Sequence, residues 1–243
     1  RFDYVPRLRQ TLALGISQSG QSPDIVAVLA AARRQSAPTA ALTNTPSSPL
    51  AEAADHVIDL SAGVERSVAA TKTYTAALGA LAMLSVAMGA GELATGLDAV
   101  PDAMSEALAA GPAAEAAAQL LAKASRCVVR GRGYHYATAF ELSLKVKELT
   151  HLLAEPYSTA DFMHGPLAVI EPGFPVVVID IGDTFRDEIS TLRRSLADQH
   201  ATVIVFTDRP EDVKSAELAV PVPGSVPEAL TPIPAILPAQ IMA

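Results

Sequence analysis

The sequence alternates short apolar runs of strand length with longer segments of helical periodicity, and this alternation restricts the possible fold more than any other feature. The apolar runs span residues 11–16, 38–44, 56–61, 126–131, 174–181 and 201–208. The helical patterns span residues 24–34, 47–54, 70–89, 136–153 and 185–199. Parallel strands need crossover connections, which are usually helices. The alternation therefore predicts an α/β fold, with parallel sheets covered by helices on both faces.

An alanine-rich stretch, residues 93–125, separates two series of strands and helices and is predicted to be a helical connector. It contains the helix-breaking pair Gly111–Pro112. We place the domain boundary at this pair, which gives one domain at residues 1–111 and a second at residues 112–243. The proline-rich end of the chain, from residue 220 onward, is predicted to hold one short helix at most.

Charge and cysteine content argue against several classes of protein. The 243 residues carry a formal net charge of −8 without a concentrated basic face, so nucleic acid is not an expected partner. The apolar stretch at residues 78–94 is short and rich in Ala and Gly, which favours a buried helix over a membrane span. The single cysteine, Cys127, excludes a disulfide framework and suggests a cytoplasmic location.

Small polar residues gather where the first strand-length run meets the first helical segment. The sequence there is SQSGQS, residues 17–22, and its candidate ligand groups are Ser17, Gln18, Ser19 and Ser22. The carboxyl edge of a parallel sheet and the unpaired N–H groups of a helix start together favour anion binding. Hydroxyl and amide groups can donate to phosphate oxygens without adding charge. A serine-rich capped turn without a ligand explains the same residues.

A second group of polar residues shares one face of the helical segment 136–153. Glu141, Lys145 and Glu148 are spaced i, i+4 and i+7, among apolar residues that cover much of the remaining surface. A solvated Glu–Lys stripe is the simplest explanation of this pattern. The segment, however, follows GRGYHY, a glycine-flanked strand end of the kind that borders a ligand crevice. The charges are therefore predicted to face a pocket.

Histidines offer one further candidate, His164, which lies in DFMHGPLAV between a polar turn and a Gly-Pro pair. A lone histidine is more often structural, and its predicted loop position is what favours a function. The remaining histidines are predicted to be structural or surface residues: His56, His135, His151 and His200. No cluster of His, Cys, Asp and Glu has the spacing of metal ligands, so no metal is predicted.

Three blocks of sequence resemble the SIS (sugar isomerase) domain family, and in particular the isomerase module of glutamine–fructose-6-phosphate amidotransferases. The block ISQSGQSPDIVAVLAAAR is similar to the family's phosphosugar-binding signature. ERSVAATKTYTAALGAL resembles its E-x-x-V-A-S-T-K segment, and RGRGYHYATAFELSLKVKELTH with the later HGPLA resembles its second SIS domain. The blocks keep the family's order and cover most of the chain. The resemblance implies two flavodoxin-like, doubly wound SIS domains.

The resemblance also implies roles for individual residues. Residues Ser17, Gln18, Ser19 and Ser22 would hold the substrate phosphate, and the backbone of Val68 would contact sugar hydroxyls. Glu148 would carry a proton between C1 and C2 of the sugar, with Lys145 orienting it or stabilising charge on oxygen. His164 would assist ring opening and would come from the partner subunit of a homodimer. Such a proton transfer needs no cofactor.

The sequence departs from the family pattern at three places. Ala70 stands where the family has serine, so one sugar or phosphate contact is expected to be lost. The strand and loop that normally open the first SIS domain would lie before Arg1, so this domain is expected to be truncated. The family's C-terminal tail, with its active-site lysine, is not visible before the chain stops at PAQIMA.

Two classes of function fit these residues. The first is an enzyme that isomerises, and with some substrates deaminates, a hexose or amino-sugar 6-phosphate. The second is a non-catalytic sensor of phosphosugars, because SIS domains also occur in regulators. Two SIS-like halves, together with Glu148 and His164 at the family's catalytic positions, favour the enzyme.

Overall fold

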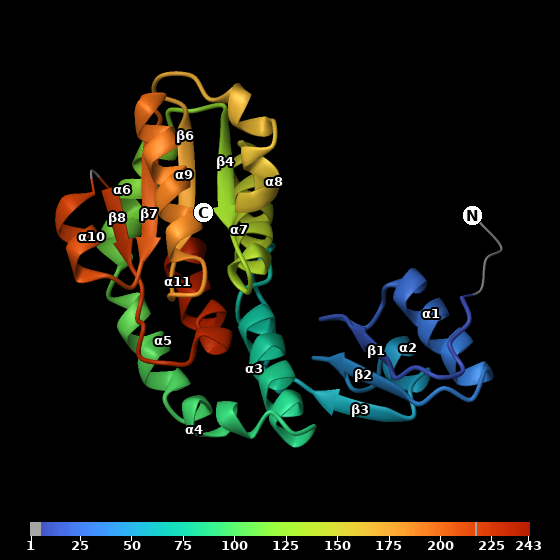
Figure 1. Cartoon of the computed structure of the whole chain (residues 1–243). Helices are drawn as coiled ribbons and strands as arrows, with labels where there is room; N and C mark the ends of the chain where they lie inside the picture. The colour runs from blue at the N-terminus through green and yellow to red at the C-terminus, as the bar shows by residue number, and fades with distance from the viewer. Residues whose placement is uncertain (1–5, 217) are drawn as a thin grey trace. The chain divides into compact units, whose positions relative to one another are not determined.

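The computed structural model describes residues 6–216 and 218–243, and the chain divides into two compact units between Ser85 and Val86 (Figure 1). This division lies before the pair Gly111–Pro112, where the sequence suggested a domain boundary. Gly111 instead begins a helix with Pro112 in its first turn. Proline is tolerated at that position because the N–H it lacks would have no partner within the helix.

The first unit contains a sheet of three parallel strands in sequential order. Its elements are β1 (Ala13–Ile16), α1 (Pro23–Arg34), β2 (Thr39–Thr43), α2 (Pro49–Glu52) and β3 (His56–Asp59). The helix α3 (Lys72–Ala87) contains the point at which the two units divide. A small core between the sheet and its helices consists of Leu29, Ala41, Leu50 and Ala54. The order β1-β2-β3 has no reversal, so the described part of this sheet is not doubly wound.

The second unit contains a sheet of five parallel strands in the order β5-β4-β6-β7-β8. Its strands are β4 (Arg126–Gly131), β5 (Leu153–Ser158), β6 (Pro175–Asp180), β7 (Thr202–Thr207) and β8 (Leu218–Pro221). Numbered within the sheet, this order is 2-1-3-4-5, which is the flavodoxin-like doubly wound order. The predicted α/β architecture is therefore confirmed, and the second sheet has the predicted strand order.

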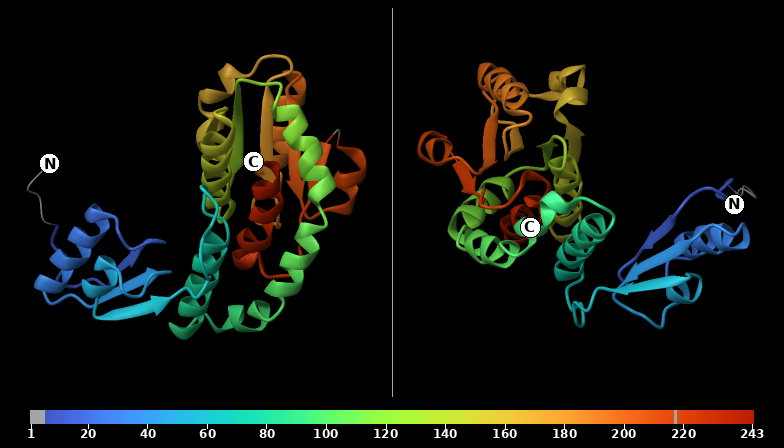
Figure 2. Two further views of the ribbon diagram at one scale, coloured as in Figure 1. Left: turned by 180° about the vertical axis from the view of Figure 1, so that it is seen from behind. Right: turned by 60° about the horizontal axis from the view of Figure 1, so that its bottom comes forward.

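Helices cover both faces of this sheet. The helical elements that lie wholly in the second unit are η1 (Gly91–Leu93), α4 (Ala94–Leu97), α5 (Val100–Leu108), α6 (Gly111–Leu121), α7 (His135–Thr150), α8 (Thr159–Met163), η2 (Pro166–Val169), α9 (Arg186–Asp198), α10 (Pro210–Ser215), η3 (Glu228–Leu230) and α11 (Pro232–Met242). Figure 1 shows α9 in front of the sheet, and the rear view in Figure 2 shows α6 and α11 in front of it. The helix α11 packs against α5, α6 and α7.

The two strands that the sequence did not predict, β5 and β8, are the two edge strands of the second sheet. Each contains a proline, Pro156 in β5 and Pro221 in β8. Proline cannot donate to a neighbouring strand, so within sheets it is found on edge strands or at the first residue of a strand, where Pro175 lies in β6. The prediction also extended the helix at 136–153 too far, because α7 ends at Thr150 and His151 takes a left-handed φ of 61°.

The connector and the end of the chain match the expectations, but the apolar stretch 78–94 does not form the expected buried helix. Its residues, in α3 and just beyond it, are all half-buried or exposed. The connector is helical, since η1, α4, α5 and α6 fill most of residues 93–125, and the end of the chain holds the single α-helix α11. Within the described parts of the chain, no helix is both long enough and apolar enough to cross a membrane.

Candidate functional site

The loop SQSGQS leaves the carboxyl end of β1 and turns directly into α1. The turn depends on Gly20, which has a φ of +64°. A Cβ at this position would lie 2.0 Å from the Oγ of Ser48, which caps α2. Only glycine therefore combines the required backbone conformation with the close approach of the α2 N-terminus. The backbone oxygen of Gly20 also accepts a hydrogen bond from the N–H of Leu50, at 3.1 Å.

The serine hydroxyls of this loop stabilise its backbone while their protons remain able to donate. The Oγ of Ser17 accepts from the N–H of Gly20 at 3.2 Å, and the Oγ of Ser19 accepts from the N–H of Gln21 at 3.3 Å. A hydroxyl that accepts one hydrogen bond can still donate its own proton. Ser22 occupies the N-cap position of α1 without a capping hydrogen bond from its side chain. The loop thus presents three hydroxyl donors near the positive end of a 12-residue helix.

An open pocket of about 520 Å³ lies beside this loop, at the carboxyl edge of the first sheet. Its walls are polar and consist of Gln18, Asn44, Thr45, Asp59, Ser61, Gly63, Val64 and Glu65. The side chain of Asn44 holds the far wall in place. Its Nδ2 donates to the carbonyl of Gly63 at 2.7 Å, and its Oδ1 accepts from the N–H of Ala62 at 2.9 Å.

Glu65 joins the pocket wall to the start of α3. Its Oε2 accepts hydrogen bonds from the N–H of Thr71 and from both the N–H and the hydroxyl of Thr73. Burial alone would raise the pKa of Glu65, but the hydrogen bonds from Thr73 and Thr71 outweigh it and lower the pKa. The Nζ of Lys72 donates to the carbonyl of Val64, so this lysine also stabilises the turn.

Sequence reasoning missed most residues of the pocket wall, among them the polar residues Asn44, Asp59 and Ser61. Each lies at or just beyond the carboxyl end of a predicted strand, which is the same signal that drew attention to SQSGQS. Val68, predicted to contact the sugar through its backbone, lies in a bend, is 96% exposed and is outside the pocket wall.

The second predicted group lies on α7, as expected from its spacing. The Nζ of Lys145 lies 3.0 Å from Oε1 of Glu141 and 3.5 Å from Oε2 of Glu148. Lys145 is buried and Glu141 nearly so, whereas the side chain of Glu148 is 41% exposed. The stripe is therefore not simply solvated. One buried ammonium lies between two carboxylates, and only Glu148 is open to a ligand.

Burial has a clear electrostatic effect on this group. It raises the pKa of Glu141, and the hydrogen bond and charge of Lys145 offset part of that rise. Glu141 was noticed in the sequence only as part of the stripe. In the structure it is the carboxylate that anchors Lys145, which in turn pairs with Oε2 of Glu148.

His164 lies immediately after α8 and is exposed, in the loop predicted for it. Its backbone N–H donates to the carbonyl of Asp161 at 3.3 Å. Among the described residues, no hydrogen bond or ion pair joins His164 to the three charged residues on α7. A role for His164 therefore remains a prediction.

At the switch point of the second sheet, between β4 and β6, side chains of the described residues lie close to the loop that follows β4. The ring of Phe185 fills the space beside Gly133, where a Cβ would lie 2.6 Å from it. The guanidinium of Arg132 lies over that ring at 4.8 Å and pairs with Glu188 at 3.1 Å. Side chains of the protein itself thus occupy the place where doubly wound sheets usually bind ligands.

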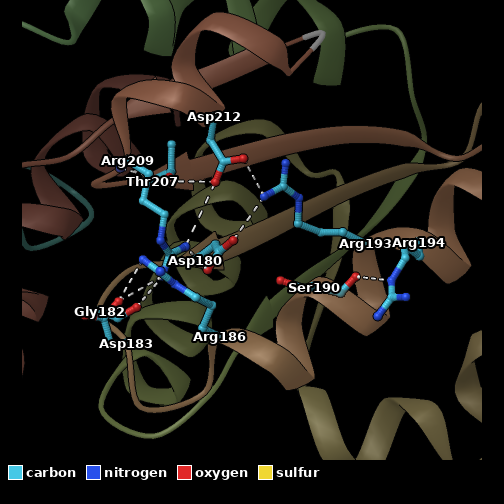
Figure 3. Close-up of polar contacts among 10 residues, drawn as sticks. All are labelled: Asp180, Gly182, Asp183, Arg186, Ser190, Arg193, Arg194, Thr207, Arg209 and Asp212. Atoms are coloured by element: carbon cyan, nitrogen blue, oxygen red, sulfur yellow. Dashed lines mark hydrogen bonds and ion pairs between the residues drawn. The ribbon is translucent and has the colours of Figure 1, made fainter.

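The carboxyl ends of β6 and β7 carry a network of paired charges (Figure 3). Asp180 is buried and pairs with Arg209 at 2.6 Å and with Arg193 at 3.1 Å. Arg193 also pairs with Asp212 at 2.9 Å. Burial alone would lower the pKa of Arg209, but the hydrogen bond to Asp180 and its charge raise the pKa. These charges compensate one another, so the network ties the sheet to α9 and α10.

Across the described residues, no group of three or more His, Cys, Asp and Glu side chains is arranged to hold a metal ion. The donor groups of the first unit are hydroxyls and amides, with two carboxylates at the pocket. This donor set suits a polar organic ligand with an anionic end.

Comparison with known proteins places these features in a family. The model of the SIS domain matches residues 8–87 and 120–223. An isomerizing glutamine–fructose-6-phosphate aminotransferase from Bradyrhizobium diazoefficiens is 33% identical over 255 residues, covering 100% of this chain. The chain spans 42% of the length of that relative.

Solved structures share the fold of this chain. The C-terminal domain of glucosamine-fructose-6-phosphate aminotransferase from Francisella tularensis superposes with a TM-score of 0.91 at 24% identity, covering 99% of this chain and 72% of that one. Tagatose-6-phosphate ketose/aldose isomerase from Escherichia coli gives a TM-score of 0.80 at 25% identity, covering 96% of this chain and 66% of that one. The chain belongs to the SIS domain family and is homologous to the isomerase part of glutamine–fructose-6-phosphate aminotransferases.

Proposed function

We propose that this chain binds a hexose or amino-sugar 6-phosphate and catalyses its aldose–ketose isomerisation; when the substrate carries an amino group, water hydrolyses the resulting imine to the ketose and ammonia. The observation that carries the proposal is the serine loop at the start of α1, beside a polar pocket. Its hydroxyls and the helix N-terminus suit a phosphate, and the pocket suits the hydroxyls of a sugar. The names of the relatives, which include an isomerase and aminotransferases of sugar phosphates, support the same substrate class.

In this proposal different residues contact the phosphate and the sugar of the ligand. Ser17, Ser19 and Ser22 donate to phosphate oxygens, and Gln18 reaches both the phosphate and the pocket. The backbone near Val68 contacts sugar hydroxyls. Because none of these groups is charged, phosphate affinity depends on donor geometry and on the helix dipole.

The proton transfer is assigned to α7. Glu148 removes a proton from the carbon next to the carbonyl or imine and returns it to the neighbouring carbon, through an enediol or enamine intermediate. Lys145 orients Glu148 and stabilises negative charge that develops on the substrate oxygen. His164, supplied by the partner subunit of a homodimer, assists ring opening. The homodimer and a cytoplasmic location are part of the proposal.

The decisive experiment measures ammonia release and fructose 6-phosphate formation from glucosamine 6-phosphate, using the complete gene product. Turnover that is weakened by Ser19→Ala, but not by Ser105→Ala on the exposed side of α5, would support the proposal. Binding of sugar phosphates without turnover of any hexose or amino-sugar 6-phosphate would instead indicate a phosphosugar sensor. Absence of binding by isothermal titration calorimetry, or the same affinity in Ser19→Ala, would contradict the phosphate site.

A further inference from the structure

The ends of the three strands in the first unit place Asp59 in line with the serine loop. The N–H of Ser17 donates to the carbonyl of Leu42 at 3.1 Å, which continues the β1–β2 ladder into the loop. On the other side of β2, Thr43 is in register with Asp59, the last residue of β3. Ser17, Thr43 and Asp59 therefore lie in a row across the carboxyl edge of the sheet.

This row sets the distance between the two ends of the pocket. Neighbouring strands are about 4.8 Å apart, so two spacings separate the Ser17 backbone from that of Asp59 by roughly 10 Å. That length is comparable with an extended six-carbon sugar phosphate. A ligand with its phosphate at the serine loop would therefore direct the opposite end of its carbon chain toward Asp59, which forms part of the pocket wall.

The charge of the pocket is unusual for a site that takes an anion. Asp59 and Glu65 contribute carboxylates, while no lysine, arginine or histidine is present among the described residues of the wall. The three donors from Thr71 and Thr73 engage Glu65. Asp59 accepts one hydrogen bond, from the N–H of Ser61 to Oδ1 at 2.9 Å, and is exposed. Within the described part of the chain, no donor is hydrogen-bonded to its second oxygen, which can accept from a ligand.

We propose, on the basis of the sugar-phosphate function above, that Asp59 is a specificity-determining residue that selects sugar phosphates carrying a cationic amino group. A carboxylate binds an ammonium more strongly than a neutral hydroxyl, because the hydrogen bond is charge-assisted at both ends. A ligand without a cation brings an anionic phosphate into the same pocket as two carboxylates and has no positive charge to pair with Asp59. An amino-sugar phosphate brings a positive charge to the acidic end of the pocket and a phosphate to the serine loop.

The test compares three ligands of similar shape by isothermal titration calorimetry with the complete gene product. Glucosamine 6-phosphate carries the ammonium, glucose 6-phosphate has a hydroxyl in its place, and N-acetylglucosamine 6-phosphate has a neutral amide. Glucosamine 6-phosphate is expected to bind at least about tenfold more tightly than glucose 6-phosphate. In Asp59→Asn this preference should fall to within about twofold, mainly through weaker binding of glucosamine 6-phosphate. Asp98→Asn, an exposed aspartate outside the pocket, should keep it.

The outcomes separate this inference from the proposed function. If all three ligands bind with equal affinity, and Ser19→Ala weakens all of them, the phosphate site stands and the role of Asp59 is overturned. A preference for glucosamine 6-phosphate that persists in Asp59→Asn would overturn it as well. If no sugar phosphate binds, the proposed function itself fails. If Asp59→Asn unfolds at the same temperature as the wild type, a change in its preference for glucosamine 6-phosphate does not come from a loss of folding.

Discussion

The Nζ of Lys145 lies 3.5 Å from Oε2 of Glu148, one turn further along α7. The lysine is buried, while the glutamate side chain is partly open to solvent. The buried ammonium of Lys145 thus pairs with one oxygen of the Glu148 carboxylate. The exposed part of the Glu148 side chain stays accessible to a ligand. This arrangement is what a positioned proton carrier requires, and it gives two tests that separate catalysis from stability.

Glu148→Gln should abolish proton transfer while leaving sugar-phosphate binding intact. The amide keeps the shape of the side chain but cannot accept a proton, so turnover should fall at least about a hundredfold. The measurement is steady-state turnover of glucosamine 6-phosphate, together with a binding titration. Glu115→Gln, on the exposed face of α6, serves as the matched control. Normal turnover in Glu148→Gln would show that Glu148 is not the catalytic base.

Lys145→Met should destabilise the second unit strongly. Removing the ammonium leaves Glu141 buried without its partner, and breaking a buried ion pair in this way costs about 3–5 kcal/mol. The measurement is the free energy of unfolding from urea denaturation. The double variant Lys145→Met with Glu141→Gln should recover part of the loss, because no unpaired buried charge remains. A single variant as stable as the wild type would show that the pair does not contribute to folding.

Acidification should destabilise the fold through His135. Burial lowers the pKa of this histidine from 6.5 to about 4, and its ring lies between the hydroxyls of Thr138 and Thr231, with Nε2 2.9 Å from the Thr231 Oγ1. As the pH falls from 6.5 to 4, the unfolded chain takes up a proton that the folded chain does not, so stability is lost across this window. The loss from this residue is about 3 kcal/mol.

Urea denaturation at several pH values would check this expectation. His135→Gln should show a shallower loss of stability between pH 6.5 and pH 4 than the wild type. The exposed His56→Gln should behave like the wild type across the same window. Equal pH dependence in His135→Gln and the wild type would mean that other groups dominate acid unfolding.

Gly20→Ala should disrupt the serine loop. The added Cβ would meet the side chain of Ser48, in a backbone conformation that costs alanine of order 1 kcal/mol or more by itself. Affinity for sugar phosphates should fall at least about tenfold. Gly173→Ala is the matched control, since Gly173 also has a positive φ, of +81°, but a Cβ there meets nothing within 4 Å. Comparable binding by the two variants would show that the close approach to Ser48 is unimportant.

The elements that could be predicted from the amino-acid sequence are those that bury apolar residues on both sides or along one face. The central strands β4, β6 and β7 were predicted within a residue or so, because burial on both faces makes their sequences continuously apolar. The edge strands β5 and β8 were not, because an edge tolerates proline and polar residues. The domain boundary was placed at a Gly-Pro pair that in fact begins α6.

The residues of the candidate site also differ in whether the sequence alone could identify them. Residues that are consecutive, such as SQSGQS, or repeated at helical spacing, such as Lys145 and Glu148, could be found from the sequence because local geometry brings them together. Asn44 and Asp59 could not be assigned to the pocket, since only the parallel register of β1, β2 and β3 places their ends side by side. Burial likewise distinguished Glu141 from Glu148, because desolvation depends on packing from distant parts of the chain.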